Sequence, residues 1–127
     1  FSPSARYNLT NLYRSMFALE LEKRIDDKVS ITVAHPGITK SRQSRPYEVK
    51  KIKKSLFTYI STDISTGTNS IIEAIKKVNV SANKTFAPKL FGIYGKPTTM
   101  KHNTLVYNQD LRNRLWNFTA EELGLDL

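Results

Sequence analysis

Only two segments of this 127-residue chain have the pattern of a strong β-strand, and this scarcity limits the folds that are open to it. In residues 29–34, apolar side chains alternate with small or polar ones, and residues 90–94 form the second candidate. Two strands make a poor sheet, and parallel sheets are normally buried on both faces. We therefore expect the chain to form the edge of a larger sheet.

Helical patterns surround these strands. Residues 4–24 are apolar on more than one stripe, which is typical of a helix buried on two sides. Segments from Pro46 to about residue 60 and from about 65 to 77 each have one apolar face. A last helix is expected from about 108 to 118, and residues 119–122 could be a capping box that restarts one final turn. This order of elements fits part of an α/β layer.

The composition excludes several classes of site. Hydrophobic residues make up 39% and charged residues 24%, which is typical of a globular sequence. The absence of cysteine excludes disulfides, a thiol nucleophile and cysteine-based zinc sites within these residues. His35 and His102 have no ligand cluster around them in the sequence, so no metal site is expected. No apolar run reaches the roughly 18 residues of a membrane-spanning helix.

The net positive charge indicates an anionic partner but does not identify which one. Twenty Lys and Arg against eleven Asp and Glu give a formal net charge of +9, which attracts dinucleotide, nucleic acid or anionic lipid. A lysine run in the helix expected from Pro46 is ordinarily a solvated face. Its alternatives are contact with an anionic membrane surface or with nucleic acid. The run consists of Lys50, Lys51, Lys53 and Lys54.

One constellation suggests chemistry. Tyr7 and Asn11 are four residues apart in the first expected helix, and the strand that follows this helix ends in His35-Pro36-Gly37. In a parallel sheet, this order places the phenol and the Pro-Gly turn at the end where open α/β folds bind their ligands.

These residues resemble the C-terminal half of a short-chain dehydrogenase/reductase, in the branch that includes retinol dehydrogenase-like enzymes. Besides Tyr7 and the turn, Phe17-Ala18-Leu19-Glu20-Leu21 resembles the family's helix body, and His35 resembles that branch. Residues 90–97, Arg114-Leu115-Trp116 and Glu121-Glu122-Leu123 are similar to the closing strand and tail helix. The similarity covers nearly the whole chain but only the C-terminal portion of the family's domain.

The resemblance implies an α/β fold: the C-terminal part of a doubly wound, Rossmann-like parallel sheet, with two strands and flanking helices. The N-terminal nucleotide-binding half, with its glycine-rich turn, is lacking, so residues 1–127 are expected to be one partial domain cut from a longer chain. After the helix with the catalytic Tyr and the strand with its turn, this domain would contain substrate-lid helices at about 42–78. A closing strand at about 89–95 and a tail helix at about 108–123 would follow.

The resemblance also implies an activity and a site. The family transfers hydride between NAD or NADP and an alcohol or carbonyl substrate. Tyr7 falls on the catalytic Tyr, which exchanges a proton with the substrate oxygen. The nicotinamide end of the cofactor would be lined by Pro36, Gly37, Ile38 and Ser41.

Asn11 departs from the family, which has a Lys at this position. The Lys binds the nicotinamide ribose and lowers the pKa of the phenol from its ordinary value of about 10. An asparagine can hydrogen-bond a ribose hydroxyl, but losing the cation would raise the phenol pKa by about one unit or more, or about 1.4 kcal/mol per unit. Two interpretations stay open: an oxidoreductase, inactive as this fragment alone, and a catalytically impaired relative that serves as a binding or scaffold protein.

The expected partners follow from the same resemblance. The substrate would be a small alcohol or carbonyl compound, and the basic and apolar lid would suit a lipophilic or anionic one. A homodimer contact is expected on the helix over 4–24, and a weak association with an anionic membrane surface is an alternative. No specific nucleic acid is expected. The location would be cytoplasmic, or peripheral to endoplasmic reticulum or lipid-droplet membranes.

Overall fold

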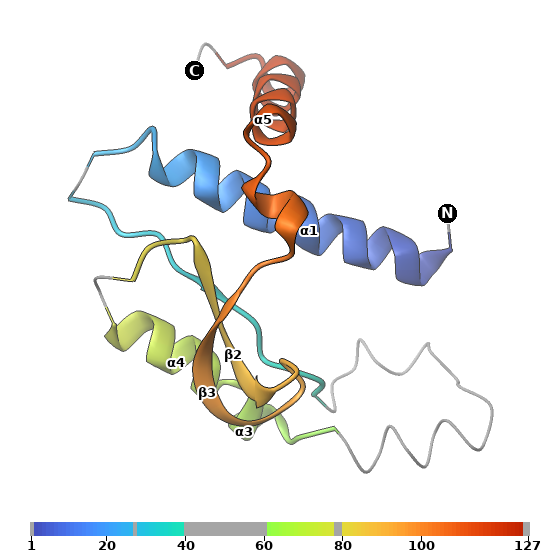
Figure 1. The fold of residues 1–127 in the computed structure, drawn as a ribbon, viewed down its shortest axis with the longest axis vertical. Coiled ribbons are helices and arrows are strands. Elements are labelled where there is room, and N and C mark those ends of the chain that lie inside the picture. The colour runs from blue at the N-terminus through green and yellow to red at the C-terminus, as the bar shows by residue number, and fades with distance from the viewer. Residues whose placement is uncertain (1, 27, 40–60, 78–79, 126–127) are drawn as a thin grey trace. The chain divides into compact units, whose positions relative to one another are not determined.

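The computed structural model describes residues 2–26, 28–39, 61–77 and 80–125 (Figure 1). It has, in chain order, α1 (Pro3–Glu22), β1 (Val33–Ala34), α3 (Ile64–Gly67), α4 (Asn69–Lys76), β2 (Lys84–Leu90), β3 (Tyr94–Lys101), the 3-10 helix η2 (Thr104–Tyr107) and α5 (Gln109–Leu123). These elements divide into two units. The described residues of the first are 2–26, 28–33, 80–84 and 101–125, and those of the second are 34–39, 61–77 and 85–100.

Helix α1 begins at a capped N-terminus. The hydroxyl of Ser2 accepts a hydrogen bond from the amide of Ala5 at 3.2 Å, and Pro3 occupies the first turn, where its missing N–H is not needed. The predicted helix is thereby confirmed. The prediction of burial on two sides is wrong for its first half, since the buried residues of α1 all lie in its second half. They are Met16, Leu19 and Glu20.

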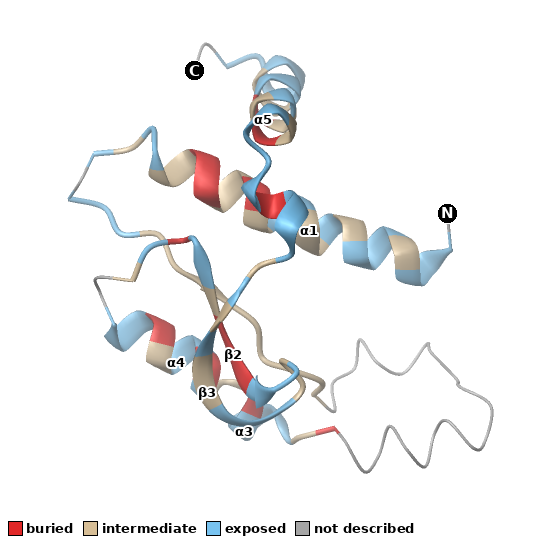
Figure 2. Cartoon of the chain, viewed as in Figure 1, coloured by how far each residue is buried: buried red, intermediate tan, exposed pale blue. Residues whose placement is uncertain are grey.

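The apolar core of the first unit forms where α1 packs against η2 and α5 (Figure 2). Met16 and Leu19 of α1 are buried together with Val106 of η2 and Ala82. Beside them, the rings of Phe17 and Trp116 stack with their centroids 5.1 Å apart. The core therefore joins three segments that are far apart in the sequence.

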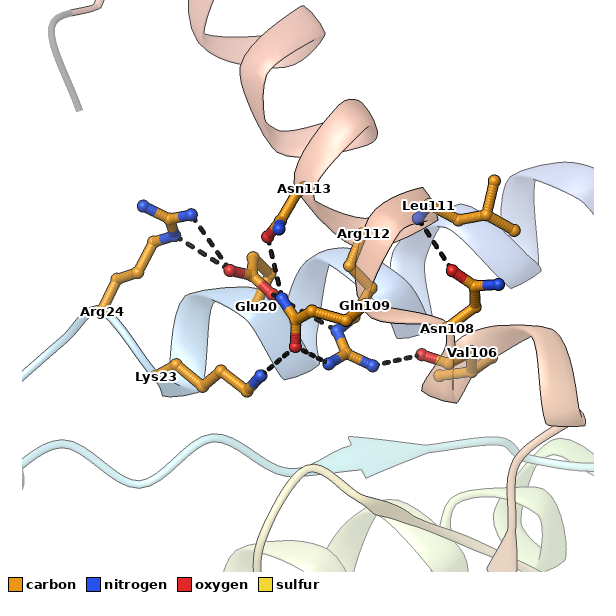
Figure 3. Close-up of polar contacts among 9 residues, drawn as sticks. All are labelled: Glu20, Lys23, Arg24, Val106, Asn108, Gln109, Leu111, Arg112 and Asn113. Atoms are coloured by element: carbon orange, nitrogen blue, oxygen red, sulfur yellow. Dashed lines mark hydrogen bonds and ion pairs between the residues drawn. The ribbon is translucent and has the colours of Figure 1, made fainter.

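A buried ion pair crosses from α1 to α5 within this unit (Figure 3). Glu20 is 3% exposed and Arg112 is 5% exposed, and Oε2 of the glutamate lies 3.3 Å from Nε of the arginine. Arg112 also donates from Nη1 to the carbonyl oxygen of Val106 at 2.8 Å. The other carboxylate oxygen of Glu20 accepts two hydrogen bonds from Arg24, at 3.2 and 3.0 Å. Both buried charges are therefore compensated.

Gln109 completes this network. Its amide nitrogen donates to Glu20 at 3.1 Å, while its amide oxygen accepts from Arg112 at 2.5 Å and from the ammonium of Lys23. Burial acts to raise the pKa of Glu20, but the hydrogen bonds from Gln109, Arg112 and Arg24 and the charge of Lys23 outweigh it. The pKa of Glu20 is held below its ordinary value.

The second unit contains a mixed three-stranded sheet in the order β1-β2-β3, so the chain is α/β. The prediction of two strands is wrong, and so is the closing strand at about 89–95. That segment holds the turn of a β2–β3 hairpin, in which the amide of Ile93 donates to the carbonyl of Leu90 at 2.9 Å. Gly92 allows this turn at a φ of +71°. The strand expected over 29–34 is reduced to β1, because Val29 and Ser30 are exposed.

Two helical predictions are corrected in detail. The helix expected over 65–77 is split at Thr68, which ends α3 and precedes α4. The hydroxyl of Thr68 donates to the carbonyl of Ser65 at 2.8 Å. The tail helix is confirmed as α5, but its final turn does not restart at Thr119, whose hydroxyl donates to the carbonyl of Leu115 at 2.8 Å within a continuous helix. The helix expected between 46 and 60 lies outside the described residues.

The buried ion pair predicts an acid-sensitive stability. Because the folded pKa of Glu20 is depressed, its stabilisation is fully present above the unfolded glutamate pKa of about 4.3 and is lost as the pH falls through the lower folded pKa. Glu20→Gln should remove this pH-dependent component and lower the free energy of unfolding at neutral pH by about 1–3 kcal/mol. Urea unfolding between neutral and acidic pH measures both effects.

Glu121→Gln is the matched control, because Glu121 is an exposed glutamate of α5. It should leave the free energy of unfolding within about 0.5 kcal/mol of the unsubstituted chain. An acid dependence that stays the same in Glu20→Gln would contradict this account of the pair.

Candidate functional site

Tyr7 and Asn11 lie one turn apart on α1, so their side chains leave the same face of the helix. Tyr7 is 49% exposed, whereas Asn11 is half-buried. The spacing read from the sequence is therefore present in the folded chain, and the phenol of Tyr7 is accessible to a solute.

Asn11 lines an open depression of about 580 Å³ in the first unit. Most of its surface is apolar, and its polar lining residues are His102, Ser15 and three asparagines. Carboxamides and hydroxyls both donate and accept hydrogen bonds. Tyr7 is not among the described residues that line it. The carboxamides belong to Asn8, Asn11 and Asn103, and the apolar lining to Ala5, Leu9, Leu12 and Val106.

The side chains of His102 and Asn103 in this depression are held by local hydrogen bonds. The Nε2 of His102 lies 2.8 Å from the carbonyl oxygen of Ala82, to which it donates. The carboxamide of Asn103 caps η2 by accepting from the amide of Leu105 at 3.0 Å. Sequence reasoning missed both residues as lining groups. The one local signal is the preference of asparagine for helix N-caps. At Asn103 it indicates the start of a helix and does not indicate a binding site.

The turn predicted to bind nicotinamide lies in the second unit and is stiffened by its own neighbours. The Nδ1 of His35 accepts a hydrogen bond from the amide of Gly37 at 2.9 Å. Burial lowers the pKa of His35, and a hydrogen bond with the Gly92 backbone acts in the opposite direction. The neutral imidazole thus fits its role as the acceptor that closes the turn.

Gly37 occupies a position that requires glycine. Its φ is +79°, and a Cβ there would lie 2.5 Å from the carbonyl oxygen of Ile93 and 3.0 Å from Pro88. The carbonyl of Ile38 is engaged as well, because it accepts from the amide and the hydroxyl of Thr62 at 2.9 and 3.3 Å. The turn is therefore a tightly packed backbone feature.

The predicted site residues fall into two sets. Tyr7 and Asn11 belong to the first unit, while Pro36, Gly37 and Ile38 belong to the second, and Ser41 lies outside the described residues. The five glycines of the sequence include no closely spaced set of the kind that binds a pyrophosphate.

The described residues offer neither a metal site nor a membrane-spanning helix. No group of three or more His, Cys, Asp or Glu side chains in that part of the chain is arranged to hold a metal ion. None of the helices in the same residues combines the length and apolarity needed to cross a membrane.

The packing of Gly37 predicts a large cost for the smallest possible side chain. Gly37→Ala should lower the free energy of unfolding by at least about 2 kcal/mol, because the alanine is disfavoured at positive φ and its Cβ meets the Ile93 carbonyl. Gly124→Ala is the matched control: its φ is +62°, but nothing lies within 4 Å of the added Cβ. It should lose only about 1 kcal/mol. Equal losses in thermal or urea unfolding would contradict the close approach at Gly37.

Comparison of the chain with protein-family models, with curated proteins and with solved structures finds no match in any of the three.

Proposed function

We propose that the chain is the C-terminal portion of an NAD(P)-dependent oxidoreductase of the short-chain dehydrogenase type, which transfers hydride on an alcohol or carbonyl substrate. The proposal rests on one observation above the others. An accessible tyrosine, Tyr7, stands one helical turn before Asn11, a polar residue that lines an open depression. The finer fold assignment, part of a doubly wound parallel sheet, belongs to the same proposal.

In this proposal, Tyr7 handles the proton of the reaction. For reduction of a carbonyl, its phenol donates a proton to the substrate oxygen as the carbonyl carbon receives a hydride, and the product is an alcohol. In the reverse direction the phenolate accepts the proton of the alcohol. The nicotinamide cofactor, when bound, donates or accepts the hydride. Proton transfer by a positioned side chain contributes about 10²–10⁴-fold to such rates.

The remaining residues of the proposed site bind and orient. Asn11 would hydrogen-bond a ribose hydroxyl, as its carboxamide can both donate and accept. The backbone at Pro36, Gly37 and Ile38 would meet the nicotinamide amide, with Ser41 nearby. The stiffness of this turn favours such a role, because a positioned backbone costs little entropy on binding.

The role of Tyr7 is tested by removing its hydroxyl. In the intact protein, Tyr7→Phe should reduce turnover of carbonyl substrates about 10²-fold or more, with little change in cofactor affinity. The absorbance of the reduced nicotinamide measures turnover, and its fluorescence measures binding. Tyr13→Phe is the matched control, because Tyr13 is a tyrosine of the same helix with 47% exposure. Equal activity in both variants would remove Tyr7 from the mechanism.

Asn11 motivates the second candidate, a catalytically impaired relative that serves as a binding or scaffold protein. An uncharged amide does not stabilise the phenolate of a neighbouring tyrosine as an ammonium would. Asn11→Lys should therefore raise turnover at neutral pH about tenfold, which corresponds to one pKa unit of the phenol. A parent protein without turnover that gains it from this substitution would favour the impaired relative. No change in turnover would remove the electrostatic account of Asn11.

We further propose a small alcohol or carbonyl substrate of lipophilic character and a homodimer contact on α1. The half-exposed ring of Tyr13 supports a contact on this helix. The proposed location is cytoplasmic, with the periphery of endoplasmic reticulum or lipid-droplet membranes as the alternative. The predicted contribution of Lys50 to Lys54 to such a location lies outside the described residues.

A further inference from the structure

The turn between β2 and β3 projects large apolar side chains into solvent. Phe91 at its apex is 89% exposed, and Leu90 and Tyr94 on either side are 55% and 54% exposed. Figure 2 shows this end of the hairpin largely in the colour of exposed residues. Single exposed apolar residues are ordinary on protein surfaces, but three around one turn form a local apolar projection.

The backbone of Phe91 makes this projection more informative. Phe91 has a φ of +52°, and it is the one non-glycine residue with a positive φ in the described part of the chain. Positive φ in a hairpin turn favours asparagine, aspartate and glycine, and disfavours a bulky side chain. A phenylalanine here strains the backbone, and because its ring is 89% exposed, burial of the ring does little to offset this strain. Backbone strain that burial within the fold does not offset indicates that the Phe91 side chain binds a partner outside the chain.

The charges around the turn are all of one sign. Lys89 and Lys96 are exposed and flank the apolar residues on the two strands. From Lys84 to Lys101 the sequence has four lysines and no aspartate or glutamate. The hairpin thus presents a fixed order from apex to base: Phe91, then Leu90 and Tyr94, then the lysines.

We propose that this turn docks on an anionic lipid surface. The order of the side chains matches the layers of a bilayer, with an apolar ring for the acyl boundary, an amphipathic Tyr for the interface and ammonium groups for the lipid phosphates. A nucleic acid would instead need the cations beside the stacking ring, along a backbone track. The site is separate from Lys50 to Lys54, and it does not depend on the proposed oxidoreductase activity.

Vesicle binding tests the proposal. The chain should sediment with vesicles of phosphatidylcholine and phosphatidylserine, and more weakly with phosphatidylcholine alone. Phe91→Asn should lower the partition coefficient about tenfold or more while folding at least as well, because asparagine is favoured at positive φ. The matched control is Ile75→Gln, which removes an apolar side chain of α4 that is 72% exposed. This control should bind as the parent does.

Two further variants test the contribution of the lysines to binding and the insertion of the side chain at position 91 into the bilayer. Lys89→Gln combined with Lys96→Gln should weaken binding to phosphatidylserine vesicles several-fold and reduce its salt dependence. Phe91→Trp should show a blue-shifted emission and quenching by brominated lipids, against the constant background of Trp116, which is 4% exposed.

Three results would overturn the proposal. They are no sedimentation with anionic vesicles, equal binding by Phe91→Asn, and no quenching of Phe91→Trp by brominated lipids. Self-association or binding of single-stranded oligonucleotide that depends on Phe91, without lipid binding, would also overturn it and would assign the apex to that other partner.

Discussion

The buried pair of Glu20 and Arg112 is the interaction on which the first unit depends. Two charges removed from water cost several kcal/mol each unless hydrogen bonds and opposite charge compensate them. Here Arg24 and Gln109 provide the remaining hydrogen bonds to the carboxylate. A shift of α5 along α1 would therefore break the ion pair and leave buried charges without partners. Arg112 also binds the carbonyl of Val106, which holds η2 against α1. Since Asn103 and Val106 line the depression beside Asn11, the shape of the candidate site follows from this pair.

The parts of the fold that sequence reasoning predicts well are those decided locally. The start of α1 at Ser2 and Pro3 and the end of α5 at Gly124 depend on residues within one turn, and both helices were predicted close to their observed bounds. The spacing of Tyr7 and Asn11 is predictable for the same reason. In contrast, Glu20 and Arg112 are 92 residues apart in the sequence. The residues next to Glu20, two leucines, do not indicate which side chain pairs with it.

The failures concern elements whose conformation is decided by distant pairing. An apolar run around residues 90–94 fits a strand as well as it fits a hairpin turn, and Gly92 was the one local sign of the turn. β3 has a weak strand pattern, with Gly95 and Pro97 near its start, and it forms by pairing with β2. The burial of α1 was overestimated because an apolar pattern shows which faces can be covered and does not show what covers them.

Glu20 and Phe91 each break a local rule, and the comparison between them separates structure from function. Glu20 is a buried charge in an apolar helix, but four side chains within the same unit act on its pKa, so its conflict is resolved inside the fold. Phe91 is a bulky residue at positive φ, and its ring is almost fully exposed, so little burial offsets the strain. Asn11 differs from both, because a half-buried asparagine in a helix violates no folding rule. In the proposed enzyme, its departure from the resembled family is electrostatic, so the proposal places its effect in the chemistry at Tyr7 and not in the stability of α1.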